Sequence, residues 1–130
     1  ERFADAVKGL LKPYDAVRFL DLNYDFHDEW IDFLANEDTS LILTLRRDQF
    51  PNMASSRITG IFSKFVLVEP ATPVSLMLNN DDMLILRDEQ FLETPGLSVR
   101  NSGTNWTFTV QGEKSNLKTV QLVVGYKAKV

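Results

Sequence analysis

The chain has 130 residues, of which 44% are hydrophobic and 25% are charged, with a net charge of −4 and no cysteine. This length fits one domain with its own core, and the lack of cysteine excludes disulfide scaffolds, cysteine-based zinc sites and thiol nucleophiles. No apolar run approaches the roughly 18 residues that span a bilayer. The acidic balance also disfavours nucleic acid as a partner, because proteins that bind it usually carry a basic surface.

The first forty residues are predicted to form an acidic, partly helical lead-in, since they hold ten acidic and four basic residues. Apolar residues at helical spacing predict a helix within 3–11, and Val17 and Phe19 predict a short extended piece. A second helix is predicted over 26–35, where one face is apolar and the other acidic. We expect this acidic face to be solvated; the alternative is a surface that steers a basic partner.

From residue 41 the apolar pattern changes to a period of two, which is typical of strands. Turn signals separate the strands at short intervals, and no helical pattern intervenes. The sequence therefore predicts an all-β fold, an antiparallel β-sandwich of the jelly-roll kind with a short helical N-terminal segment. We expect residues 1–40 to pack on a sandwich made by 41–130. The expected strands are 41–46, 57–68, 74–78, 83–86, 106–110 and 120–126.

Few residues could support catalysis or bind a ligand, and each of them also has a structural interpretation. His27, the single histidine, is expected on a helix surface. The run Asn79–Asp82 reads as a hairpin turn; calcium bound there with help from Asp88 and Glu89 is the alternative. Isolated glycines do not form a phosphate loop, and Gly60 and Gly125 fall inside strands, where they mark bulges or close packing. We therefore expect no enzyme activity, no metal and no cofactor.

The two tryptophans, Trp30 and Trp106, fit apolar stripes and are predicted in the core. The alternative is a carbohydrate-binding β-sandwich module, in which exposed aromatic rings stack on sugars. Tyr14, Tyr24 and the two tryptophans are the candidates for such stacking.

Five stretches also carry a family resemblance: Leu43–Pro51, Ser56–Phe62, Leu86–Leu92, Trp106–Val110 and Leu117–Ala128. In order and spacing they resemble the C-terminal end of the A component of bacterial Tc insecticidal toxin complexes. The resemblance covers about residues 41–130, and the N-terminal forty residues match it less clearly.

This resemblance implies a toxin subunit and a role in virulence. In that family the A component is a pentameric translocation channel, and its C-terminal β-sandwich is the platform where the B–C cocoon docks through a β-propeller. We therefore expect a non-catalytic docking domain that binds the B component, inserts into no membrane itself and binds no nucleic acid. Its parent would be a homo-oligomeric bacterial protein, secreted or associated with the cell surface. Because the chain begins at Glu1 and shows no signal peptide, it is expected to be a fragment.

The resemblance lies in framework residues, with Phe91 and Trp106 expected in the core. The predicted partner contact is the loop at 49–56, with Phe50, Asn52 and Met53 as the contact residues, because Phe50 and Met53 are apolar side chains of an exposed kind among polar ones. The alternative is that Phe50 closes the end of the sandwich.

Overall fold

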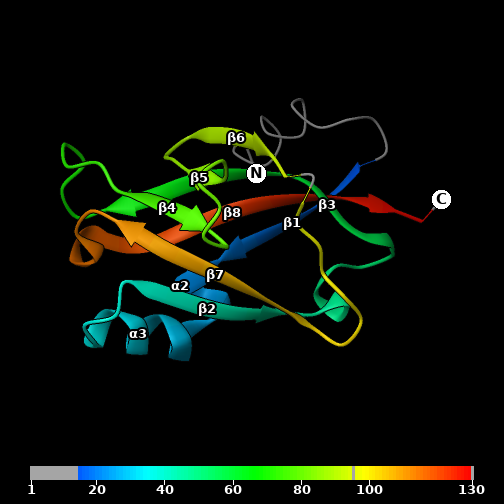
Figure 1. Ribbon diagram of the computed structural model, residues 1–130, viewed down its shortest axis with the longest axis horizontal. Coiled ribbons are helices and arrows are strands. Elements are labelled where there is room, and N and C mark those ends of the chain that lie inside the picture. Colours follow the sequence, from blue (N-terminus) through cyan, green and yellow to red (C-terminus); the bar gives the residue numbers. More distant parts are fainter. Residues whose placement is uncertain (1–14, 95, 130) are drawn as a thin grey trace.

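The computed structural model describes residues 15–94 and 96–129, so the helix predicted within 3–11 lies outside the described residues (Figure 1). The helices are α2 (Leu22–Asp25) and α3 (His27–Ala35), and two 3-10 turns are η1 (Arg47–Gln49) and η2 (Lys114–Asn116). The strands are β1 (Asp15–Asp21), β2 (Ser40–Leu45), β3 (Met53–Leu67), β4 (Ser75–Leu78), β5 (Ile85–Leu86), β6 (Gln90–Glu93), β7 (Thr104–Gln111) and β8 (Leu117–Ala128).

The strands form two four-stranded antiparallel sheets. The first has the order β1-β8-β3-β6 and the second β2-β7-β4-β5. The pairs β1–β8, β2–β7, β3–β6 and β4–β5 are nested, as in one long hairpin that has been rolled up. This is the strand order of an eight-stranded jelly roll, so the predicted fold class is confirmed.

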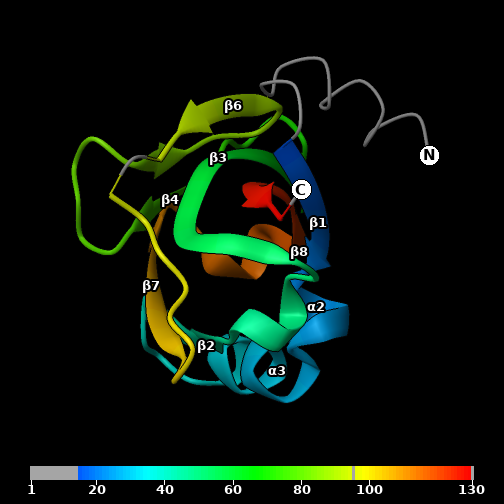
Figure 2. The same ribbon diagram turned by 90° about the vertical axis from the view of Figure 1, so that its right-hand side faces the viewer.

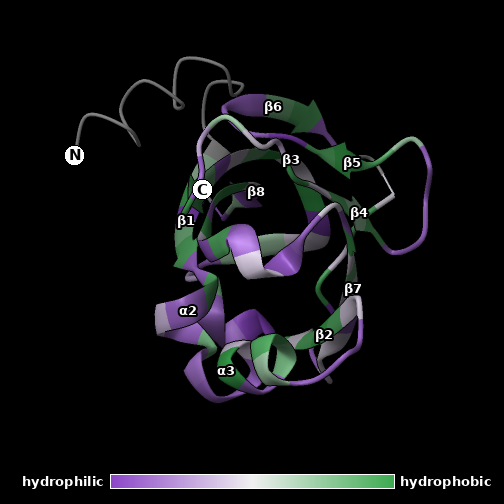
Figure 3. Cartoon of the chain, turned by 90° about the vertical axis from the view of Figure 1, so that its left-hand side faces the viewer, coloured by the Kyte–Doolittle hydropathy of each residue, from purple (hydrophilic) through white to green (hydrophobic). Residues whose placement is uncertain are grey.

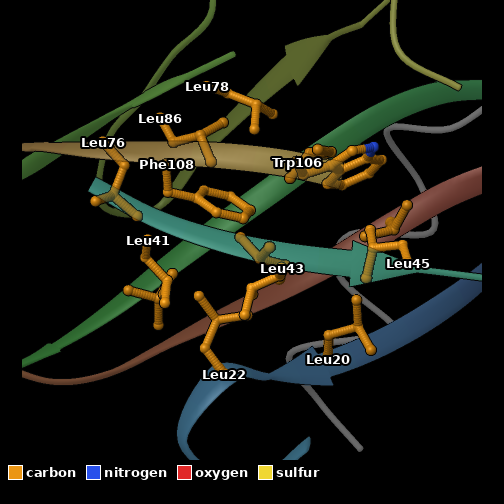
Figure 4. Packing of buried hydrophobic residues seen from close by; sticks show 14 of the residues in the cluster. Leu20, Leu22, Leu41, Leu43, Leu45, Leu76, Leu78, Leu86, Trp106 and Phe108 are labelled. Carbon is orange, nitrogen blue, oxygen red and sulfur yellow. The ribbon is translucent and has the colours of Figure 1, made fainter. Parts of the chain in front are cut away.

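The core lies between the sheets because the buried side chains alternate along the strands. In β2, Leu41, Leu43 and Leu45 are buried and the residues between them are exposed. Figure 4 shows these leucines gathered with Phe108 and Trp106 of β7. A period of two places alternate side chains on the same face, which explains why the sequence pattern predicted these strands.

The predicted helix over 26–35 is confirmed as α3, which buries Trp30 and Phe33. The two helices lie on the open side of the sandwich between β1 and β2 (Figure 2). The indole Nε1 of Trp30 donates a hydrogen bond to the Lys118 carbonyl at 3.2 Å. The ammonium of Lys114 donates to the carbonyls of Phe33, Asn36 and Asp38, which fastens the end of α3 to η2. A cation at this position also suits the negative end of the helix dipole.

Other expectations need correction or completion. β1 lies within the residues expected as a lead-in, yet it is hydrogen-bonded to β8 over its full length. Phe91 is not in the core: it belongs to edge strand β6, and its half-buried ring covers Gly60. A Cβ built on Gly60 would overlap that ring, so close packing does explain this glycine.

Candidate docking surfaces

Three segments far apart in the sequence bring basic side chains to one end of the sandwich. The segments are 46–57, 96–104 and 127–129, and together they hold six basic residues and one acidic residue, Asp48. Figure 1 places this end on the right, where β2 ends, β3 begins and β8 terminates. We call this surface the basic end, defined by Arg46, Arg47, Arg57, Arg100, Lys127 and Lys129.

Backbone register holds the basic end together. Met53 pairs with Ala128, and the Lys129 amide donates to the Asn52 carbonyl at 2.7 Å. Arg46 lies beside Gly103, with its Cγ 3.5 Å from where a Cβ on that glycine would sit. A depression of about 450 Å³ opens among these loops, and its polar lining includes Arg47, Asp48, Asn52, Asn101 and Lys129.

The predicted contact residues lie at this end, but two of the three are buried. Phe50 and Met53 expose 1% and 3% of their surface, so the exposure expected of them is wrong. The Phe50 ring meets Tyr126 edge-on with 5.4 Å between centroids, and the Tyr126 hydroxyl donates to the Pro51 carbonyl at 2.8 Å. Phe50 therefore closes the sandwich end, whereas Asn52 is exposed and adopts a left-handed backbone with φ of 59°.

Acidic residues cluster around the two helices. Residues 21–38 contain seven acidic residues and no Lys or Arg. We call this surface the acidic helical pair, defined by Asp21, Asp25, Asp28, Glu29, Asp32, Glu37 and Asp38. All but Asp21 are exposed, and Figure 3 shows largely hydrophilic colour on the outer sides of α2 and α3. Tyr24 and Ile31, exposed by 84% and 48%, add apolar area to it.

The outer face of the second sheet is a third surface, and it is uncharged. Its polar side chains pair with one another: Thr44 Oγ1 donates to Asn105 Oδ1 at 2.7 Å, and Ser75 Oγ donates to Gln111 Oε1 at 3.1 Å. Ile42 lies on the same face and is 58% exposed. None of the strand positions on this face carries a formal charge. Contact with a partner would therefore remove little hydration from charged groups.

The remaining sequence candidates have structural roles. Asn79 Oδ1 accepts from the Thr107 amide at 3.0 Å and Asp81 Oδ1 accepts from the Met83 amide at 2.9 Å, so the predicted turn is confirmed. The Asp88 carboxylate accepts from the Phe65 amide. His27 is exposed on the helix surface. Within 15–94 and 96–129, no group of three or more His, Cys, Asp or Glu side chains is placed to hold a metal ion.

The two tryptophans are buried as predicted, with 1% and 0% exposure for Trp30 and Trp106. Among the described aromatic residues that were candidates for sugar stacking, this leaves Tyr24 on the surface; Tyr14 lies outside the described residues.

Among the residues that the structure describes, two groups have shifted pKa values. A hydrogen bond to the Glu89 carboxylate raises the pKa of Lys64, and burial raises the pKa of Tyr126. Lys64 connects β3 with the β5–β6 turn, whereas Tyr126 holds β8 to the loop of the basic end. Both groups therefore keep their protons at higher pH in the folded protein than in the unfolded chain.

The described helices are also too short or too polar for any of them to cross a membrane. Comparison with known proteins adds no family assignment: neither a protein-family model nor a curated protein matches the chain.

Proposed function

We propose that this chain is a non-catalytic docking domain of a Tc-like toxin A subunit, and that it binds the B–C component for toxin translocation. The observation that supports it is where the five resembling stretches lie. They occupy the end of β2 with η1, the middle of β3, the β5–β6 connection, β7 and β8. All five therefore belong to one jelly roll, the kind of scaffold that the resemblance requires.

The shape of the domain is suited to this role. A rigid sandwich can present loops whose backbone is fixed by neighbouring strands, and such loops commonly carry binding function. The loop from Arg46 to Met53 is held in this way. The Gln49 amide donates to the Arg46 carbonyl at 3.0 Å, and Gln49 Oε1 accepts from the Arg46 amide at 2.9 Å. Arg47 Nη2 donates to the Met53 carbonyl at 2.8 Å.

The direct test is binding of the chain to the β-propeller-bearing B component of a Tc complex. We expect a stable complex in sedimentation velocity, and competition by excess free chain. In the intact A subunit, deletion of residues 41–130 should abolish assembly with the B–C component. Assembly that survives this deletion would refute the proposal.

A carbohydrate-binding module is the alternative, and exposed Tyr24 is the observation that favours it. Its ring could stack on a sugar, as aromatic side chains do in such modules. A glycan array should then give hits that Tyr24→Ala removes. An array without hits would eliminate this alternative.

A further inference from the structure

We propose that the basic end is the surface through which the domain docks, and that its partner surface is an acidic patch on a folded protein. This inference rests on the proposed docking function and names the chemistry of the partner.

The first argument is the charge of the basic end. Its three segments carry six basic residues against one acidic residue. All six residues except half-buried Arg47 are exposed. Clustered charges of one sign raise the association rate with a complementary surface and disfavour partners of like charge.

The second argument is rigidity. Arg46 and Arg47 flank the start of η1, whose backbone is fixed by hydrogen bonds on both sides. Arg100 lies in a turn closed by the bond from its amide to Thr104 Oγ1 at 2.9 Å. The buried side chain of Phe50 packs in the core beneath this surface. Preorganised positions lose less conformational entropy on binding, so these charges can contribute to affinity and specificity.

The third argument selects a protein over a nucleic acid. β2 places Glu37 and Asp38 of the acidic helical pair about 20 Å from Arg46, at roughly 3.3 Å per strand residue, whereas Asp25 approaches η1 through Arg18, which contacts both Asp25 and the Gln49 carbonyl. A long polyanion lying along the domain would meet the carboxylates of the acidic helical pair, whereas a compact acidic patch would contact the basic end alone. Phe50, the aromatic side chain of the 46–57 loop, is buried and offers no ring for base stacking.

The test compares two double variants that each change the net charge by the same amount. Arg100→Glu with Lys129→Glu alters the basic end, and Arg87→Glu with Lys118→Glu alters exposed positions elsewhere. We expect the first to slow association with the B component by about tenfold or more at low salt, and the second to leave it within about twofold. Asp48→Asn should accelerate association, and all of these differences should shrink as salt rises.

A second arm separates this inference from the proposed function. A short oligo-L-glutamate peptide, which cannot reach along the domain, serves as the probe of a compact acidic patch, and duplex DNA serves as the competing class. If the B component does not bind but oligo-L-glutamate binds through the basic end, the proposed function fails and the inference stands. Equal effects of the two double variants on both probes would overturn the inference, as would tighter binding of DNA than of oligo-L-glutamate. Thermal unfolding of each variant checks that it is folded.

Discussion

The acidic helical pair and the basic end are stabilised by the same kinds of interaction, but their charged residues are distributed differently along the sequence. Each is anchored by a buried aromatic side chain, Trp30 in the first and Phe50 in the second. Each is fastened by a cation that donates to backbone carbonyls, Lys114 in the first and Arg47 in the second. The acids, however, are close neighbours in the chain, whereas the bases are drawn from three distant segments.

Arg18 connects the two regions. Its Nε donates to the Gln49 carbonyl in η1 at 2.9 Å, and its Nη2 lies 3.8 Å from Asp25 at the end of α2. Elsewhere β2 separates Glu37 and Asp38, which follow α3, from Arg46 by about 20 Å. This distance is more than a Debye length at physiological salt, which is about 8 Å, so these charges of the two regions can be altered separately.

The largest effect is expected when either anchor is removed. Trp30→Ala and Phe50→Ala each leave a cavity in a close-packed core, which should lower the free energy of unfolding by about 3–5 kcal/mol. Chemical denaturation followed by far-ultraviolet circular dichroism measures both on the same scale. A loss below about 1 kcal/mol for one anchor would show that its region is not packed into the common core.

Removing the cation at the end of α3 should have the next largest effect. Lys114→Met keeps much of the side-chain length but deletes three hydrogen bonds to carbonyls and the contact of the ammonium with the Phe33 ring, 4.6 Å from its centroid. We expect a loss of about 1–3 kcal/mol. Lys118→Met is the matched control, since Lys118 is exposed and should change stability by less than about 0.5 kcal/mol. Equal losses in the two variants would contradict this role of Lys114.

Tyr126→Phe tests the fastening of the basic end. It keeps the ring contact with Phe50 but deletes the hydrogen bond to the Pro51 carbonyl. We expect a loss of about 1 kcal/mol at neutral pH, measured by denaturant unfolding. Unchanged stability would mean that solvent replaces this bond without cost.

Alkaline pH should weaken the fold. The reference pKa values are 10.5 for Lys64 and 10.0 for Tyr126, and both are raised in the folded protein. Above these values the unfolded chain releases protons that the folded protein retains, so stability falls as pH rises until the folded pKa values are passed. Unfolding measured between about pH 8 and 11 should show this decline, less steep in Tyr126→Phe and in Glu89→Gln. If the decline in each variant is as steep as in the unaltered chain, the assignment of the decline to Lys64 and Tyr126 is contradicted.

The smallest stability effect is expected at the charges of the basic end themselves. Arg100→Glu with Lys129→Glu changes exposed positions, so the free energy of unfolding should change by about 0.5 kcal/mol or less. Differential scanning fluorimetry can compare this variant with the unaltered chain. A much larger loss would show that these charges hold the fold rather than present a surface.

The contrast between the regions also explains what could be predicted from the sequence. The α3 helix and the β2 strand have a buried face that repeats with the period of the element, so a short window reveals them. β6 was missed because Gln90–Glu93 is a short edge strand in which no residue is fully buried. Phe50 was expected to be exposed because it lies in a polar loop, but its burial depends on Tyr126, which is distant in sequence.

The basic end could not be predicted as a surface for the same reason. A slight basic excess in residues 41–130 was the one available signal. Register between β3 and β8, and the position of Gly103 against Arg46, bring those charges together. Such information is tertiary and does not appear in any local pattern.

The nested strand pairing has a consequence for how the chain folds. β4 and β5 pair across a short turn, whereas in the outermost pair Asp15 lies opposite Lys127. Closing larger loops costs more entropy, so pairing from the inner hairpin outward should be favoured, with β1–β8 joining late. Many distant contacts also predict folding in milliseconds to seconds rather than microseconds. The segment that carries the acidic helices would then join the fold last and open first.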